Sequence, residues 1–148
     1  MHLVLTFFHR FKGPEIIFSY PLGLESEIEN KIIRFFDLDL DETFFEIILI
    51  NQQQRIINLY FEIYSKWARG NVEMLMLSMI VNQKFEHFNE QMYDFLRTAK
   101  KMIVETEDIY KAFYKNDDFY DKDMEIDIYY EILKKILVES IDGLIKVI

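Results

Sequence analysis

Cysteine is absent from this 148-residue chain, and glycine and proline are scarce, with 4 and 2 copies. The absence of cysteine excludes a disulfide framework, a thiolate zinc site and a cysteine nucleophile. So little glycine and proline is untypical of linkers and disordered segments. A hydrophobic core must therefore stabilise the fold, and the 51% of hydrophobic residues, which include 14 Phe and 9 Tyr, can supply it.

Positive charge is also limited, with 17 Lys and Arg against 26 Asp and Glu and a net charge of −9. This balance disfavours binding to nucleic acid and direct adsorption to anionic lipid. No run approaches the ~20 apolar residues of a membrane helix. Arg10 and Lys12 follow the first apolar run, whereas a signal peptide has its positive charges before it. We expect a soluble, cytoplasmic protein that reaches membranes only through partners.

The N-terminal segment indicates a β-hairpin. Residues 2–9 and 15–20 are apolar runs that flank Gly13 and Pro14, and Pro21 closes the second run. A Gly-Pro pair between two such runs predicts a turn.

Three more runs, residues 43–50, 55–65 and 72–81, read as strands. They are apolar on both faces more than they alternate, which is typical of a sheet covered on both sides. The segment Ser26-Glu27-Ile28-Glu29 has the form of a capping box and predicts a helix over residues 26–36.

Two C-terminal stretches, residues 85–103 and 128–145, carry apolar residues at spacings of three and four, which predicts helices. The acidic segment 115–121 predicts a surface loop between them. The length fits one domain over residues 1–148. The order ββαβββαα predicts an α/β (α+β) fold: a five-stranded antiparallel sheet with one helix on one face and two on the other.

The sequence of residues 8–21, FHRFKGPEIIFSYP, resembles the first hairpin of longin domains in nitrogen-permease-regulator and DENN-type proteins. The element order extends this resemblance over most of the chain. It implies a stand-alone, archaeal-type longin domain without catalytic residues. Such domains pair with other longin or roadblock-type domains, or bind small GTPases and trafficking proteins.

No catalytic, metal or cofactor site is indicated by local spacing. The three histidines lack a His or carboxylate partner at metal-site spacing, and we expect His2 and His9 on the surface. The acidic patterns at residues 37–41 and 117–123 lack the Gly of a calcium loop. No Ser has a neighbouring His, and the glycines are too far apart for a phosphate loop. We therefore expect a non-enzyme that uses no cofactor.

Trp67 lies beside Arg69 in the turn before residue 72. Both residue types are enriched at binding hot spots, so Trp67 is a candidate interface anchor. The alternative is that Trp67 packs against the end of the sheet while Arg69 points to water.

The predicted helix 26–36 carries apolar residues outside its core stripe. If Ile28, Ile32 and Phe35 face the sheet, Ile33 lies about 100° or more from each of them and is exposed. Phe36 lies at the boundary and is expected to be half-exposed.

The strand at residues 43–50 is expected at the edge of the sheet, with Glu46 as its only charge and no Pro or Lys to protect it. A homo- or heterodimeric partner that covers this strand and the preceding helix would shield both. The predicted apolar contacts are Ile33, Phe36, Phe44 and Ile48.

These observations favour a protein-interaction module, an adaptor in small-GTPase regulation or membrane traffic. The alternative is a small-ligand sensor of PAS-like architecture, which a cavity lined by polar groups would favour. The core offers few buried polar candidates for that role beyond Asn58 and Ser78. A third alternative, an enzyme of unknown type, would need titratable groups that converge from distant segments.

Overall fold

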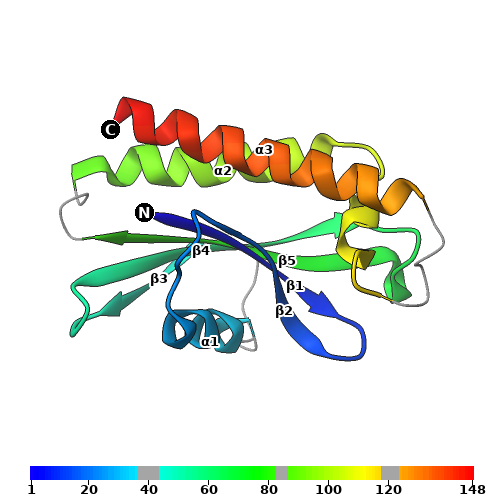
Figure 1. The fold of residues 1–148 in the computed structure, drawn as a ribbon, viewed down its shortest axis with the longest axis horizontal. Helices are drawn as coiled ribbons and strands as arrows, with labels where there is room; N and C mark the ends of the chain where they lie inside the picture. Colours follow the sequence, from blue (N-terminus) through cyan, green and yellow to red (C-terminus); the bar gives the residue numbers. More distant parts are fainter. Residues whose placement is uncertain (37–43, 83–86, 118–123) are drawn as a thin grey trace.

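The computed structural model describes residues 1–36, 44–82, 87–117 and 124–148. It confirms the predicted order of strands and helices and the three-layer arrangement (Figure 1). The strands are β1 (His2–His9), β2 (Gly13–Tyr20), β3 (Phe44–Leu49), β4 (Gln54–Tyr64) and β5 (Val72–Asn82). The helices are α1 (Ser26–Phe35), α2 (Asn89–Glu105) and α3 (Glu125–Val147), with short 3-10 turns η1 (Arg69–Asn71) and η3 (Ile109–Tyr114).

The five strands form one antiparallel sheet in the order β2-β1-β5-β4-β3. β5 lies at its centre, and β4 and β5 pair along 11 residues each, from Gln54 opposite Asn82 to Tyr64 opposite Val72. β2 and β3 are the two ends of the sheet, so β3 is an edge strand as predicted.

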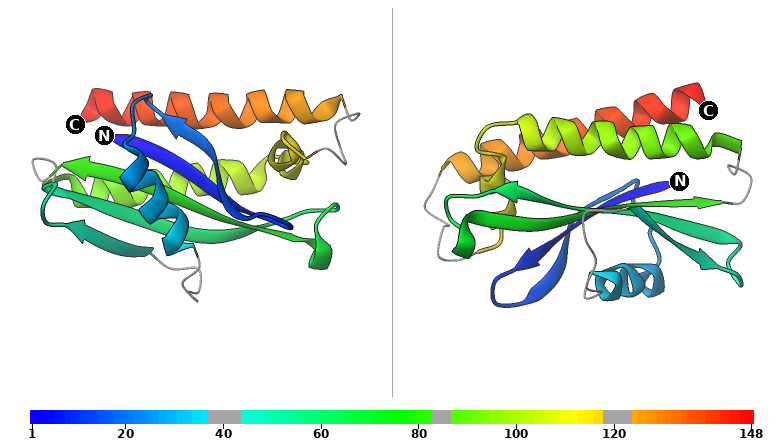
Figure 2. Two further views of the ribbon diagram at one scale, coloured as in Figure 1. Left: turned by 60° about the horizontal axis from the view of Figure 1, so that its bottom comes forward. Right: turned by 180° about the vertical axis from the view of Figure 1, so that it is seen from behind.

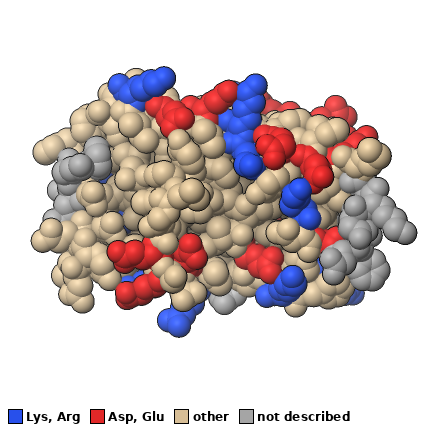
Figure 3. All heavy atoms as spheres, viewed as in Figure 1, with Lys and Arg blue, Asp and Glu red and all other residues tan. Residues whose placement is uncertain are grey.

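Both faces of the sheet are buried, which the two-sided apolar strands predicted. On β5, Leu75, Leu77 and Met79 contribute to a large cluster with α2 and α3. Met76 and Ile80 alternate with them and contribute to a smaller cluster on the opposite face with α1. Figure 2 shows α1 alone on one side of the sheet and the other two helices on the other. Charged side chains on the face drawn in Figure 3 lie mainly along the helical layers, above and below a largely uncharged band.

The phase of α3 differs from the prediction at its ends. Ile128 is 58% exposed and Ile145 is also exposed, although both were assigned to the apolar stripe. The buried stripe consists of Ile126, Leu133, Leu137, Ile141 and Leu144. Because an α-helix turns about 200° between residues two apart, burial of Ile126 directs Ile128 to solvent.

Two local interpretations were wrong. The cap of α1 is Glu25 and makes no side-chain capping bond, so Ser26 is the first helical residue and the capping box is not formed. Gly13 and Pro14 are strand residues opposite His9 and Phe8, and the turn occupies residues 10–12. Gly13 has a φ of 77°, a conformation that glycine adopts without strain. The Tyr20–Pro21 peptide bond is cis.

The acidic pattern at residues 37–41 lies outside the described residues.

Phe36 is only 8% exposed, which corrects its predicted half-exposure. Its ring lies 6.1 Å from that of Phe8 and 5.7 Å from that of Tyr60, centroid to centroid. The last turn of α1 therefore closes over β1 and β4, and Phe36 belongs to the core. Ile33 is half-buried, and it is not among the residues of the core cluster under α1.

We expect Phe36→Ala to lower the free energy of unfolding by about 3 kcal/mol, because it leaves a cavity between two aromatic rings. The matched variant Ile33→Ala should cost about 1 kcal/mol or less. Urea unfolding followed by circular dichroism measures both values. Equal losses in the two variants would contradict the helix phase described here.

Candidate functional site

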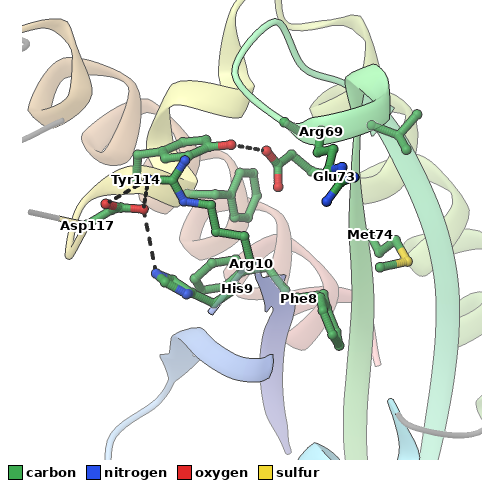
Figure 4. Close-up of a pocket in the computed structure, with 12 residues that line it drawn as sticks. Phe8, His9, Arg10, Arg69, Glu73, Met74, Tyr114 and Asp117 are labelled. Atoms are coloured by element: carbon green, nitrogen blue, oxygen red, sulfur yellow. Dashed lines mark hydrogen bonds and ion pairs between the residues drawn. The ribbon is translucent and has the colours of Figure 1, made fainter. Parts of the chain in front are cut away.

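A cavity of about 220 Å³ opens where the ends of β1 and β5 meet η3. Figure 4 shows side chains from these three elements converging on it. Its polar lining consists of His9, Arg10, Arg69, Glu73, Tyr114 and Asp117. Its apolar lining consists of Phe7, Phe8, Ala68, Val72, Met74 and Phe113. Asp117 lies 107 residues from Arg10, so only the fold brings this set together.

His9 is 7% exposed, which corrects its predicted surface position. Its Nδ1 accepts hydrogen bonds from the backbone N–H groups of Phe11, at 3.1 Å, and Lys12, at 3.2 Å. An imidazole nitrogen that accepts two hydrogen bonds carries no proton, so the proton lies on Nε2 in the neutral ring. Nε2 lies 3.6 Å from Oδ2 of Asp117. His9 thus stabilises the hairpin turn and links it to η3.

Asp117 is buried too, although it was predicted to belong to an acidic surface loop. Arg10 Nη2 lies 3.3 Å from its Oδ2 and 3.4 Å from its Oδ1. The guanidinium group of Arg10 also lies over the ring of Phe11, 4.8 Å from the centroid. The ion pair balances the charge of the buried Asp117 within the site. The other acidic residues of that segment, Asp118, Asp121 and Asp123, lie outside the described residues.

Glu73 is the second buried carboxylate, 6% exposed at the start of β5. Its Oε1 accepts hydrogen bonds from Ser65 Oγ, at 3.0 Å, and from the hydroxyl of Tyr114. Its Oε2 makes no hydrogen bond within the described part of the chain. Burial raises the pKa of Glu73, and the two hydrogen bonds together with the nearby Arg10 and His9 only partly oppose that shift. The cavity therefore contains a carboxylate with one oxygen unused.

Aromatic packing positions the hydroxyl of Tyr114. Trp67 lies edge-on to Tyr114 and Tyr110, with ring centroids 5.1 Å and 5.4 Å away. Trp67 is half-buried against the end of the sheet, as the packing alternative predicted, whereas Arg69 is exposed where it borders the cavity. Ser65 is held by its backbone N–H, which donates to the carbonyl of Asn71 at 2.9 Å.

Sequence reasoning missed this site because its groups come from distant segments. One signal was present: Glu73 is a charge within a strand that is apolar on both faces. A charge at such a position needs a hydrogen-bonding environment. Asn58 and Ser78 are buried as predicted, with Ser78 Oγ donating to Asn58 Oδ1 at 2.6 Å. The expectation of few further buried polar groups was wrong, because Thr6, His9, Arg55, Ser65, Glu73 and Asp117 are also buried.

The residues predicted to form a partner surface do not lie together. Ile48 is 66% exposed on edge strand β3. Phe44 packs edge-on against Tyr93 of α2, 4.8 Å between centroids, with the guanidinium of Arg97 5.0 Å from its ring. It is therefore partly covered by the chain itself.

On the opposite face of the sheet, α1 contacts β3 through Phe35, whose ring lies 6.4 Å from that of Phe45. Ile33 is about 160° away from Phe35 around the helix. It therefore points away from β3, and Ile33 and Ile48 belong to different surfaces.

Glu46, the single charged residue of β3, interacts within the chain. It accepts a hydrogen bond from the hydroxyl of Tyr93, and its Oε1 lies 3.6 Å from Nη1 of Arg55. Nη2 of Arg55 donates a hydrogen bond to Oδ1 of Asn89. Burial, followed by the hydrogen bond to Glu46, raises the pKa of Tyr93 to about 12. This network joins β3 and β4 to α2 and leaves β3 without an unpaired charge.

Within the described ranges, no group of three or more metal-ligating side chains occurs. None of the helices there is long and apolar enough to span a membrane. No protein-family model matches this chain, and no curated protein matches it. The longin resemblance therefore rests on the hairpin residues and the element order.

We expect Glu73→Gln to stabilise the protein relative to the wild type at neutral pH and not at acidic pH. A carboxyl group with a raised pKa destabilises the folded state once the pH passes its ordinary value, near 4.5. The other charged and titratable groups that line the same cavity are Arg10, Arg69, His9, Asp117 and Tyr114. The amide keeps an oxygen for Ser65 and Tyr114.

Melting temperatures of both proteins from pH 4 to pH 8 measure this effect. The advantage of the variant should grow as the pH rises. An advantage that shrinks over that range would show that Glu73 ionises without penalty in the folded state.

Proposed function

We propose that this chain is a non-enzymatic protein-interaction module that dimerises through β3. The observation that carries the proposal is the apolar end of this edge strand, where Ile48 is 66% and Ile50 81% exposed. No further strand in the described ranges pairs with β3, so its outer edge presents backbone groups that no described strand uses. Native edge strands are usually protected by Lys, Pro or bulges, and β3 contains neither residue.

The partner that β3 fits is a second copy of this chain. Two β3 strands related by a two-fold axis can pair antiparallel, which makes the interface self-complementary. Like charges opposite each other would oppose the pairing, but Glu46 is already engaged by Arg55 and Tyr93. β2, the other edge, has half-buried side chains and no exposed apolar residue to anchor a partner.

The longin resemblance supports a setting in the cytoplasm, in small-GTPase regulation or membrane traffic. In that setting the same edge would also accept another longin or roadblock-type domain, or a GTPase, and the dimer would act as an adaptor. The resemblance, together with the edge strand, supports the adaptor role.

A second candidate function is that of a small-ligand sensor, and a specific observation favours it. The cavity between β1, β5 and η3 is lined by the polar groups that such a function requires. The two functions are compatible, since the cavity and the β3 edge share no residue.

We expect Ile48→Lys to weaken dimerisation about tenfold or more, because it removes an apolar contact and places two like charges at the interface. The fold should be unaffected, since the side chain is mostly exposed. Sedimentation velocity over a range of concentrations measures the association.

Ile33→Asp is the matched control, because Ile33 points away from β3, and this variant should dimerise like the wild type. A wild-type chain that stays monomeric at high concentration would contradict the β3 dimer. So would an Ile48→Lys variant that associates as strongly as the wild type.

We also expect the purified protein to turn over neither GTP nor ATP, because its cavity lacks a phosphate-binding loop. Release of inorganic phosphate measures this activity. Turnover that Glu73→Gln abolishes would assign a catalytic role to the cavity and contradict the non-enzymatic proposal.

A further inference from the structure

The cavity at Glu73 contains one oxygen atom for which the fold supplies no donor. Glu73 is 6% exposed, and both of its hydrogen bonds end on Oε1. Oε2 is not one of the fully buried side-chain atoms that lack a hydrogen-bond partner, so it is accessible from the cavity. The two hydrogen bonds stabilise the carboxylate in part, but a buried charge is best compensated when a cation pairs with it, and no described residue forms an ion pair with Glu73. The nearby cation, Arg10, is engaged by Asp117.

A second charged group at the cavity, the exposed guanidinium of Arg69, also has no partner among the described residues. Arg69 lines it from η1, and its guanidinium makes no ion pair or hydrogen bond with any residue that the structure describes. Glu73 and Arg69 form no ion pair with each other, although both border the same space (Figure 4). The charges of Arg10 and Asp117 neutralise each other. Glu73 and Arg69 are the negative and the positive group that a ligand could then bind.

The rest of the wall is apolar, with Phe8, Val72, Met74 and Phe113 facing the cavity. Its volume of about 220 Å³ is below the range of about 300–1,000 Å³ that drug-sized ligands occupy. The ligand must therefore be small. It must also offer a donor, an anionic group and an apolar portion.

We propose that this cavity binds a small zwitterion, an α-amino acid with an apolar side chain. Its ammonium group donates to Oε2 of Glu73, its carboxylate binds Arg69, and its side chain packs against Phe8 and Met74. An ammonium group suits Glu73 better than a hydroxyl does, because it also neutralises a buried charge. This inference rests on the second candidate function, ligand binding, and is independent of the β3 dimer.

Calorimetric titration of the full chain with glycine, valine, leucine and methionine tests the proposal. Two analogues of valine test the contribution of each charge. Isobutylamine has the same skeleton without the carboxylate, and isovalerate has it without the ammonium group. We expect at least one of the apolar amino acids to bind saturably. If valine binds, each half-ligand should bind about tenfold or more weakly, the effect of losing one charged hydrogen bond.

Two variants assign the contacts. Glu73→Gln retains an acceptor for Ser65 and Tyr114, and it should weaken amino-acid binding about tenfold without weakening the binding of isovalerate. Arg69→Gln should weaken the binding of valine to about the affinity of isobutylamine, and it should not weaken the binding of isobutylamine itself. Arg34→Gln, an exposed position on α1, is the matched control and should bind like the wild type.

No saturable binding of any of the four amino acids would show that the cavity is not a site for this class. Binding that Glu73→Gln leaves unchanged would place the ligand elsewhere. Isobutylamine binding as tightly as valine, with no effect of Arg69→Gln, would make the ligand a simple amine. Ile48→Lys should bind amino acids normally, which separates this test from that of the dimer.

Discussion

The burial of β5 on both faces is the constraint on which the rest of this structure depends. β5 pairs with β1 on one side and β4 on the other, and its alternating side chains enter two separate hydrophobic clusters. Neither cluster forms without its helical layer, so α1 must cover one face and α2 with α3 the other. Glu73 lies near one end of this strand, where polar side chains of η3 and the first hairpin replace the apolar layers.

The sequence predicted the sheet and its layers because apolar runs and helical spacings are properties of consecutive residues. The strands were located within two residues of their observed bounds wherever these bounds are described. The errors arose where a contact with another layer decides the outcome. Phe36 is buried because β1 and β4 supply rings to cover it, and Ile128 is exposed because Ile126 takes the sheet-facing position. η3 has too few residues to show a helical period.

The candidate site was less predictable than the fold for the same physical reason. Its interactions join residues that lie far apart in the sequence, such as Tyr114 and Glu73, 41 positions apart, and Arg10 and Asp117. Sequence motifs are defined by local spacing, so a charged residue whose partner lies far away in the sequence, such as Asp117, is predicted to lie on the surface. His9 shows how a local role can also mislead, since a histidine beside a turn is usually solvated. Here its ring accepts two backbone hydrogen bonds and is buried by that arrangement.

The register of β4 and β5 has a consequence for how this molecule could transmit a signal. Ile48 of β3 lies opposite Arg55 of β4, and Arg55 lies opposite Val81 of β5. Val81 is eight positions from Glu73 along β5, which corresponds to roughly 26 Å at about 3.3 Å per residue. The ladder between these points is a continuous set of paired backbone groups. The cavity and the exposed end of β3 therefore lie at opposite ends of one hydrogen-bonded sheet, and the pairing of β4 with β5 is unbroken between them. A ligand at the cavity could therefore influence a partner at β3 only by shifting the paired strands, or the helices packed on them, as a unit.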